Sequence, residues 1–160
     1  MIGFGYDVHR LQEGESLILG GITLESRLGT VAHSDGDVLL HAIMDALLGA
    51  LSLGDIGLHF PDTKEEWRGA DSIAMLKRVV HLIRNEGAHV VNIDSTVVLE
   101  APRLRPHIEA MRERVAEAVG VEVKRISIKA TTSERLGFVG REEGVAAYAV
   151  AQVDYDRTSS

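Results

Sequence analysis

Residues 36–50 read Gly-Asp-Val-Leu-Leu-His-Ala-Ile-Met-Asp-Ala-Leu-Leu-Gly-Ala. Apolar residues recur in this stretch at the three- and four-residue spacing of a helix with one buried face. Ser34 or Asp35 can begin the helix, because each side chain can accept a hydrogen bond from an exposed backbone N–H of the first turn. We therefore expect a helix over residues 36–50, and its apolar face carries Leu40, Ile43, Met44 and Leu47.

Strand and helix patterns alternate on both sides of this helix. Short apolar or β-branched runs predict strands over residues 2–9, 17–24, 90–99, 125–130 and 144–153. Helical spacing predicts two further helices, over residues 71–86 and 106–119. This order favours an α/β (α+β) two-layer sandwich: a mixed sheet of about four main strands plus an N-terminal hairpin that turns at Gly20-Gly21, with helices packed on one face. We expect a single domain over residues 1–156 and a polar tail over 157–160.

Composition narrows the classes of function. The 160 residues include 17 basic and 24 acidic side chains, a formal net charge of −7, and this balance argues against nucleic-acid binding. The sequence has no cysteine, which excludes disulfides, thiolate metal sites and a cysteine nucleophile. It also has no apolar run of the ~18–20 residues that a membrane span needs, and no signal-peptide pattern after Met1. We expect a cytoplasmic protein that binds neither nucleic acid nor membranes.

Three residues from two predicted elements have the chemistry of a metal site. Asp7 and His9 are two apart in a predicted strand, so their side chains leave the same face, where they could bind zinc. On the helix, His41 lies in a stripe with Asp37 and Asp45, and it could supply a third ligand while Asp45 fixes its tautomer. Three protein ligands leave a fourth position open, as in catalytic zinc sites. The alternative is a solvated polar stripe beside a surface histidine.

Three loop segments could bind a phosphorylated ligand. The segment of residues 33–37 precedes a helix N-terminus, where backbone N–H groups favour anions, although it could equally be a simple capping segment. Carboxylates within residues 54–63 could accept hydrogen bonds from a polyol. The loop over residues 130–141 combines hydroxyl groups, a carboxylate suited to a hard divalent ion, and arginines suited to phosphate. An acidic protein that handles a diphosphate needs cations nearby, which bound metals would supply.

Together these segments resemble the 2-C-methyl-D-erythritol 2,4-cyclodiphosphate synthase family of isoprene biosynthesis. The resemblance covers essentially the whole chain, and several separate motifs occur in the family's order. These are Gly5-Tyr6-Asp7-Val8-His9, residues 33–42 from His33 to Ala42, Gly54-Asp55-Ile56-Gly57, Phe60-Pro61-Asp62-Thr63, Lys129 to Phe138, and Gly140-Arg141. The resemblance implies a lyase whose small α/β subunits form a homotrimer, with active sites between neighbouring subunits.

The resemblance also assigns roles to individual residues. It implies that Asp7, His9 and His41 bind zinc, that Glu134 binds a second divalent ion, Mg²⁺ or Mn²⁺, and that His33 and Thr132 are catalytic. It implies a single catalytic domain and a cytidine diphosphate-linked substrate. Besides Asp7, His9 and Glu134, the implied substrate-binding residues are His33, Ser34, Asp55, Ile56, Gly57, Phe60, Asp62, Leu99, Glu100, Ala101, Pro102, Arg103, Leu104, Arg105, Ala130, Thr131, Thr132, Ser133, Phe138 and Arg141.

The implied reaction is an intramolecular phosphoryl transfer. The 2-phosphate of 4-diphosphocytidyl-2-C-methyl-D-erythritol 2-phosphate attacks the β-phosphorus of the same molecule, and the cyclic diphosphate and CMP result. Such a transfer needs positioning and charge neutralisation, and it needs no protein nucleophile. Two alternatives stay open at this point. The same ligands could serve a metal-dependent phosphoesterase, or the protein could be a non-catalytic trimeric sensor of isoprenoid phosphates.

Overall fold

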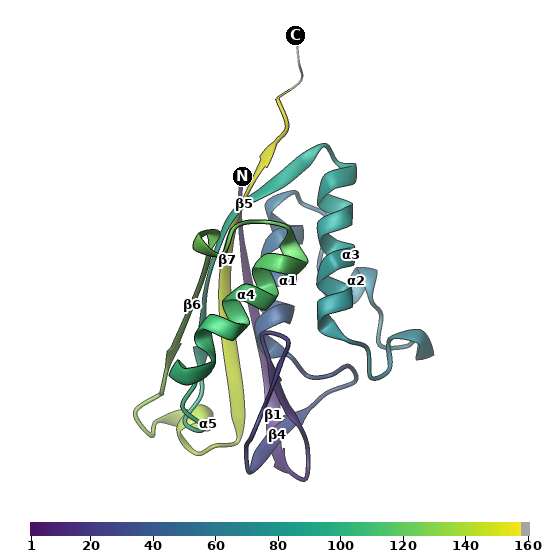
Figure 1. Cartoon of the computed structure of the whole chain (residues 1–160). Coiled ribbons are helices and arrows are strands. Elements are labelled where there is room, and N and C mark those ends of the chain that lie inside the picture. Colours follow the sequence, from purple (N-terminus) through teal and green to yellow (C-terminus); the bar gives the residue numbers. More distant parts are fainter. Residues whose placement is uncertain (158–160) are drawn as a thin grey trace.

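The main sheet contains five strands in the order β4-β1-β7-β5-β6 (Figure 1). The computed structural model describes residues 1–157, so residues 158–160 of the predicted tail lie outside the described residues. Only β5 and β6 run parallel, while every other neighbouring pair is antiparallel. The predicted mixed sheet is therefore confirmed. Its strands are β1 (Ile2–Glu13), β4 (Leu28–Val31), β5 (Ala88–Val98), β6 (Ile126–Thr131) and β7 (Gly144–Tyr155).

The fifth strand, β4, was not predicted from the sequence. It has only four residues, one of them Gly29, so it lacks a readable strand pattern. It pairs with residues 10–13, which extends β1 beyond the predicted end at residue 9. The predicted N-terminal hairpin forms a separate two-stranded sheet of β2 (Leu17–Leu19) and β3 (Ile22–Leu24), with Gly20 and Gly21 in its turn.

Three long helices pack on one side of the main sheet, as predicted (Figure 1). They are α1 (Val38–Ala50), α3 (Ser72–Asn85) and α4 (Ile108–Val119). Among residues 1–157, no helix is both long and apolar enough to cross a membrane. The shorter helical segments are α2 (Ile56–His59), α5 (Gly137–Gly140) and the 3₁₀ turns η1 (Glu65–Trp67), η2 (Arg105–His107) and η3 (Val123–Arg125).

Asp37, rather than Ser34 or Asp35, caps helix α1. Its carboxylate accepts hydrogen bonds from the backbone N–H of Leu40 at 3.0 Å and from Gly20 and Gly21 at 3.0 and 2.7 Å. The side chain is fully buried, and this burial raises its pKa to about 6. The prediction of Ser34 or Asp35 as the cap was wrong. Two of the three N–H groups that hold the Asp37 carboxylate come from the turn of a hairpin that is distant in sequence. The solvated stripe is also excluded, since Asp37 and His41 are both buried.

Glycines allow α1 to approach β1 closely. A Cβ atom built on Gly3 would lie 1.8 Å from the carbonyl oxygen of Ala46, and one on Gly5 would lie 1.9 Å from that of Ala42. Real side chains cannot make such contacts, so only glycine fits between this strand and this helix. On the same face, Asp7 and His9 follow Gly3 and Gly5. The close approach therefore brings α1 within reach of these two side chains.

The opposite face of the sheet is apolar and uncovered. Aromatic rings cluster there, with the Phe4 and Tyr148 centroids 6.5 Å apart and those of Tyr6 and Tyr148 5.1 Å apart. The side chains alternate along β1 and β7, so this face lies opposite α1. The exposed apolar residues on this face of the two strands are Ile2, Phe4, Tyr6, Val8, Tyr148 and Val150.

Candidate active site

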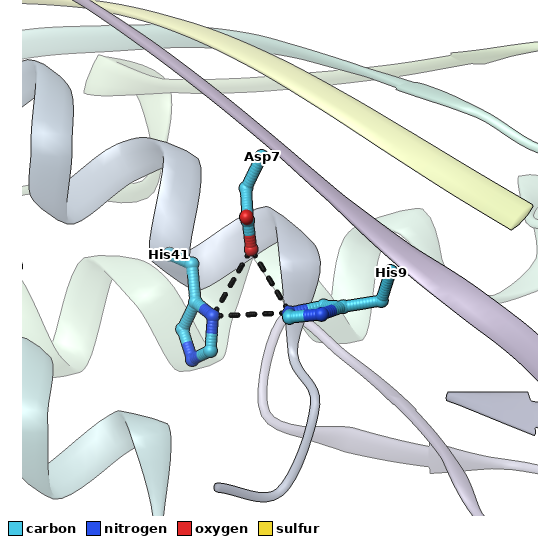
Figure 2. Close-up of side chains that lie close together, drawn as sticks. All are labelled: Asp7, His9 and His41. Atoms are coloured by element: carbon cyan, nitrogen blue, oxygen red, sulfur yellow. Dashed lines mark hydrogen bonds and ion pairs between the residues drawn. The ribbon is translucent and has the colours of Figure 1, made fainter. Parts of the chain in front are cut away.

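Three possible metal ligands converge between β1 and α1, as the sequence predicted. Asp7 Oδ2 lies 2.9 Å from His9 Nε2 and 3.1 Å from His41 Nδ1, and the two histidine nitrogens are 3.2 Å apart. Figure 2 shows the three side chains pointing toward one another, two from the strand and one from the helix. We call Asp7, His9 and His41 the triad.

The triad has the donors and the spacing of a metal site. Its three ligand atoms all lie within 4.8 Å of one another. Tetrahedral coordination at bond lengths of ~2.0–2.2 Å separates ligand atoms by roughly 3.4 Å. The observed separations of 2.9 to 3.2 Å need only a small outward movement to reach that value. One carboxylate and two imidazoles suit zinc, and a set of three ligands leaves one coordination position for another group.

The triad carries a negative charge on Asp7, as the pKa values of its members show. Burial alone would raise the pKa of Asp7, but hydrogen bonds from His41 and His9 outweigh it and lower the pKa to about 2. Burial likewise opposes the charged form of His41, yet its hydrogen bond to Asp7 raises the pKa of the imidazole. Asp7 is therefore ionised at neutral pH, so a negative charge faces the position where the three side chains meet.

The far nitrogen of His41 faces two hydroxyl groups. Nε2 lies 3.0 Å from Ser72 Oγ and 3.2 Å from Ser34 Oγ. The prediction that Asp45 holds this ring was wrong, because Asp45 Oδ1 accepts a hydrogen bond from the backbone N–H of Ile56 at 2.8 Å. Sequence reasoning missed Ser72, which begins α3 and lies 31 positions from His41, with no spacing pattern linking the two.

The segment of residues 54–63, predicted to bind a polyol, is anchored near the triad at the start of α2. Through the Asp45 hydrogen bond, the start of α2 is fixed to α1 one turn beyond His41. Asp55 caps α2 by accepting from the N–H of Leu58 at 3.0 Å, and Gly57 is exposed. Phe60 is buried against Trp67, with centroids 4.9 Å apart, whereas Asp62 and His33 are exposed.

The implied substrate-binding residues of segments 99–105 and 130–132 divide between two hollows. The larger hollow is a cavity of about 570 Å³ beside α4 and β6. Residues that were not predicted also line it, namely Ile108, Glu109, Ile128 and Lys129. Ala101 and Pro102 instead line a separate hollow of about 470 Å³ with Arg27 and Glu142, and Leu99 is buried. The predicted residues in the larger cavity are Glu100, Arg103, Leu104, Arg105, Ala130, Thr131 and Thr132.

A buried carboxylate organises the loop that follows this cavity. Glu100 has a side chain only 7% exposed, and it accepts from the backbone N–H of Ser133 at 2.8 Å and of Arg135 at 3.4 Å. Glu134 and Arg135 both have left-handed backbone conformations, with φ of 51° and 64°. Such conformations are costly for residues other than glycine and persist when the surroundings hold them. Glu100 thereby fixes a strained loop on which the Glu134 side chain is exposed.

Two remaining predicted residues lie at the end of this loop. Arg141 is paired with Glu143, with Nε 3.1 Å from Oε1. Phe138, in α5, packs close to Gly144 at the start of β7. Within one chain, the triad and the lining of the larger cavity have no residue in common. The triad and the larger cavity are therefore two separate features of the chain.

Comparison with known proteins gives the family. The model of the YgbB family matches residues 1–154. The chain belongs to the YgbB family. Its relatives include the 2-C-methyl-D-erythritol 2,4-cyclodiphosphate synthases of Synechococcus elongatus, 62% identical over 94% of either chain, and of Symbiobacterium thermophilum, 60% identical over 96% of this chain and 98% of that one. The resemblance drawn from the sequence motifs is confirmed.

Solved structures support the same relationship. A 2C-methyl-D-erythritol-2,4-cyclodiphosphate synthase with bound CDP has a TM-score of 0.89 and 40% identity to this YgbB-family chain. The match covers 96% of this chain and 100% of the other. This chain therefore has the same fold as that synthase, whose structure contains CDP.

Proposed function

We propose that this chain converts 4-diphosphocytidyl-2-C-methyl-D-erythritol 2-phosphate into 2-C-methyl-D-erythritol 2,4-cyclodiphosphate and CMP. The observation that carries the proposal is the triad, three side chains that could hold a metal ion, in a chain 62% identical to an enzyme with that name. An oxygen of the 2-phosphate attacks the β-phosphorus, the bond from that phosphorus to the oxygen bridging it to the α-phosphate breaks, and CMP leaves. No protein nucleophile takes part.

We propose that the triad holds Zn²⁺ and that Glu134 holds Mg²⁺ or Mn²⁺. When bound, these ions neutralise the charge of the diphosphate and polarise the phosphorus under attack. The protein's own contribution is to fold the substrate so that its two ends meet, which removes an entropic barrier. His33 and Ser34 orient the 2-phosphate, while residues 55–57, Phe60 and Asp62 surround the methylerythritol unit. Exclusion of water by these walls favours cyclisation over hydrolysis.

The cavity beside β6 is proposed to hold the cytidine nucleotide. Arg103 and Arg105 supply positive charge at its rim, where they can pair with phosphate oxygens. Thr131 and Thr132 supply hydroxyl groups, and Thr132 contacts the reacting diphosphate in this proposal. The other residues assigned to nucleotide binding are Leu99, Glu100, Ala101, Pro102, Leu104, Ala130, Ser133, Phe138 and Arg141.

We propose that the catalytic domain, residues 1–156, works in the cytoplasm as a homotrimer with active sites between subunits. The uncovered aromatic face formed by Phe4, Tyr6 and Tyr148 supports self-association, because monomers rarely expose large contiguous apolar patches. Separation of the triad from the nucleotide cavity within one chain supports a shared site. In a trimer, cyclic symmetry would bring the triad of one subunit to the nucleotide cavity of its neighbour three times.

Mixed trimers test the shared site. Two inactive variants, His41→Ala and Thr132→Arg, are unfolded and refolded together, and trimer mixing is checked by mass. Some boundaries then combine an intact triad with an intact nucleotide cavity, so part of the activity should return. If well-mixed trimers stay as inactive as either parent, both halves of the site belong to one chain.

Product analysis tests the reaction. The protein is incubated with the substrate, Zn²⁺ and Mg²⁺, and the phosphorus products are resolved by ³¹P NMR. We expect CMP together with the cyclic diphosphate. A linear phosphate product would instead identify a metal-dependent phosphoesterase. Binding of the substrate without release of CMP would identify a non-catalytic sensor of isoprenoid phosphates.

A further inference from the structure

The imidazole of His41 is held from both of its nitrogens. Nδ1 faces the triad, 3.1 Å from Asp7 Oδ2 and 3.2 Å from His9 Nε2. Nε2 faces the interior, 3.0 Å from Ser72 Oγ. The His41 side chain is only 7% exposed. A neutral imidazole has one proton, so the partners on the two sides compete for the nitrogen that carries it.

The hydrogen bond beyond Ser72 decides this competition. Ser72 Oγ donates to Asp35 Oδ1, and an ionised carboxylate can only accept. A serine hydroxyl has a single hydrogen, which this bond uses. Ser72 Oγ can therefore only accept from His41, which holds a proton on Nε2. Nδ1 then donates to Asp7 only when the ring carries a second proton, and in the neutral ring Nδ1 has none. The lone pair of Nδ1 is then directed toward Asp7 and His9, where a metal ion needs it.

Asp35 is itself fixed in place by the backbone. Its Oδ2 accepts from the N–H of Ser72 at 2.8 Å, and its Oδ1 accepts from the N–H of Asp37 at 3.1 Å. Ser72 is fully buried at the start of α3. Asp35 and Ser72 thus join the N-terminal ends of α1 and α3 and present one hydroxyl acceptor to His41. Neither side chain reaches the position where the three triad ligands meet.

We propose that Asp35 and Ser72 are positioning residues that hold His41 in its metal-binding tautomer. Without them, the Asp7 carboxylate would draw the imidazole proton onto Nδ1 and block that ligand atom. The Asp35–Ser72 pair opposes this from the other side of the ring, and it also fixes the ring plane. Such partners of ligating histidines typically change metal affinity by ~10–100-fold. This inference rests on the proposed zinc site.

Ser72→Ala is the sharpest variant, because Asp35 keeps its two backbone donors when only the hydroxyl is removed. Ser34→Ala is the matched control. Ser34 Oγ also lies near Nε2, at 3.2 Å, but no carboxylate accepts its hydrogen. Ser72→Thr restores the hydroxyl. Zinc affinity is measured by competition with a chromophoric chelator. Long-range ¹⁵N–¹H spectra of the zinc-free proteins, recorded at a pH where the His41 ring is neutral, identify its protonated nitrogen.

We expect Ser72→Ala to weaken zinc binding by roughly 10–100-fold and to shift the His41 proton toward Nδ1. Ser34→Ala should change the affinity less than threefold, and Ser72→Thr should recover most of the loss. If Ser72→Ala binds zinc within twofold of the wild type, or keeps the Nε2–H tautomer, the proposal is wrong. A wild type that binds no zinc would instead overturn the zinc site itself. If Ser72→Ala does not fold, Asp35→Ala is measured under the same criteria.

Discussion

Replacing Gly5 with alanine should damage both the fold and the metal site, because Gly5 is one of the two glycines that let β1 and α1 pack closely together. The new Cβ would lie 1.9 Å from the Ala42 carbonyl oxygen, about 1.5 Å short of the 3.4 Å where ordinary contacts begin. Both atoms belong to regular elements, so relief requires α1 to retreat from β1. His41 adjoins Ala42 on that helix, and its Nδ1 would move away from Asp7, now 3.1 Å distant.

Two magnitudes follow from this displacement. Overpacking of this kind costs about 1–3 kcal/mol of unfolding free energy, which lowers the melting temperature by roughly 3–12 °C in a domain of this size. Metal sites tolerate changes in ligand distance of only ~0.2 Å, so a retreat of about 1 Å should weaken zinc binding at least tenfold. The two effects should appear together, since one movement of α1 causes both.

Gly49→Ala on the same helix provides the control. A Cβ there would meet no atom closer than the Phe4 carbonyl oxygen at 3.9 Å. This variant should keep its zinc affinity and gain up to about 1 kcal/mol in stability from the better helix propensity of alanine. Calorimetry and a chelator competition assay measure both quantities. If Gly5→Ala matches Gly49→Ala in stability within 0.5 kcal/mol and retains wild-type zinc affinity, the close packing of β1 and α1 does not position His41.

Three further changes test other parts of the site. In the zinc-free protein, the pKa of Asp7 is lowered to about 2 from 3.8. The ionised carboxylate therefore stabilises the folded state by roughly 2 kcal/mol above pH 4, and this stabilisation is lost as the pH falls toward 2. The variant Asp7→Asn should show a weaker loss of stability with pH over that interval. Glu100→Ala should speed amide hydrogen exchange at residues 133–135 and weaken activation by Mg²⁺. Glu100→Gln keeps an acceptor oxygen, so both effects should be smaller in that variant. Glu134→Gln should retain zinc but need more Mg²⁺ or Mn²⁺ for activity, and an unchanged metal requirement would remove Glu134 from the mechanism.

The residues of the triad were predictable from sequence because their spacing carries the geometry. Strand periodicity puts Asp7 and His9 on one face, and helical periodicity puts His41 in one stripe with Asp37 and Asp45. The partners of these ligands were not predictable in the same way. Asp37 caps α1 through a hairpin turn, and Ser72 reaches His41 from another helix, and both contacts join segments far apart in sequence. Only the folded arrangement of α1, α3 and the β2–β3 hairpin reveals them.

Apolar and β-branched runs in the sequence predicted four strands of the main sheet, but they did not predict the edge strand β4. Strand β4 has four residues, and its pairing with residues 10–13 depends on tertiary context rather than on its own propensity. Helix α2 is equally short, with four residues, and no helix was predicted there. The 130–141 loop was predicted as a functional segment from its residue types, whereas its control by Glu100 follows only from the folded geometry.

The central claim is that the triad holds the zinc ion that cyclisation requires. It is tested most directly by measuring bound zinc and CMP release on the same purified preparations of the wild type and His41→Ala. We predict about one zinc per wild-type chain and rapid CMP release with the cyclic diphosphate as product. His41→Ala should contain almost no zinc and release almost no CMP while keeping the wild-type oligomeric state. A His41→Ala protein that keeps stoichiometric zinc and near-normal turnover would contradict the claim.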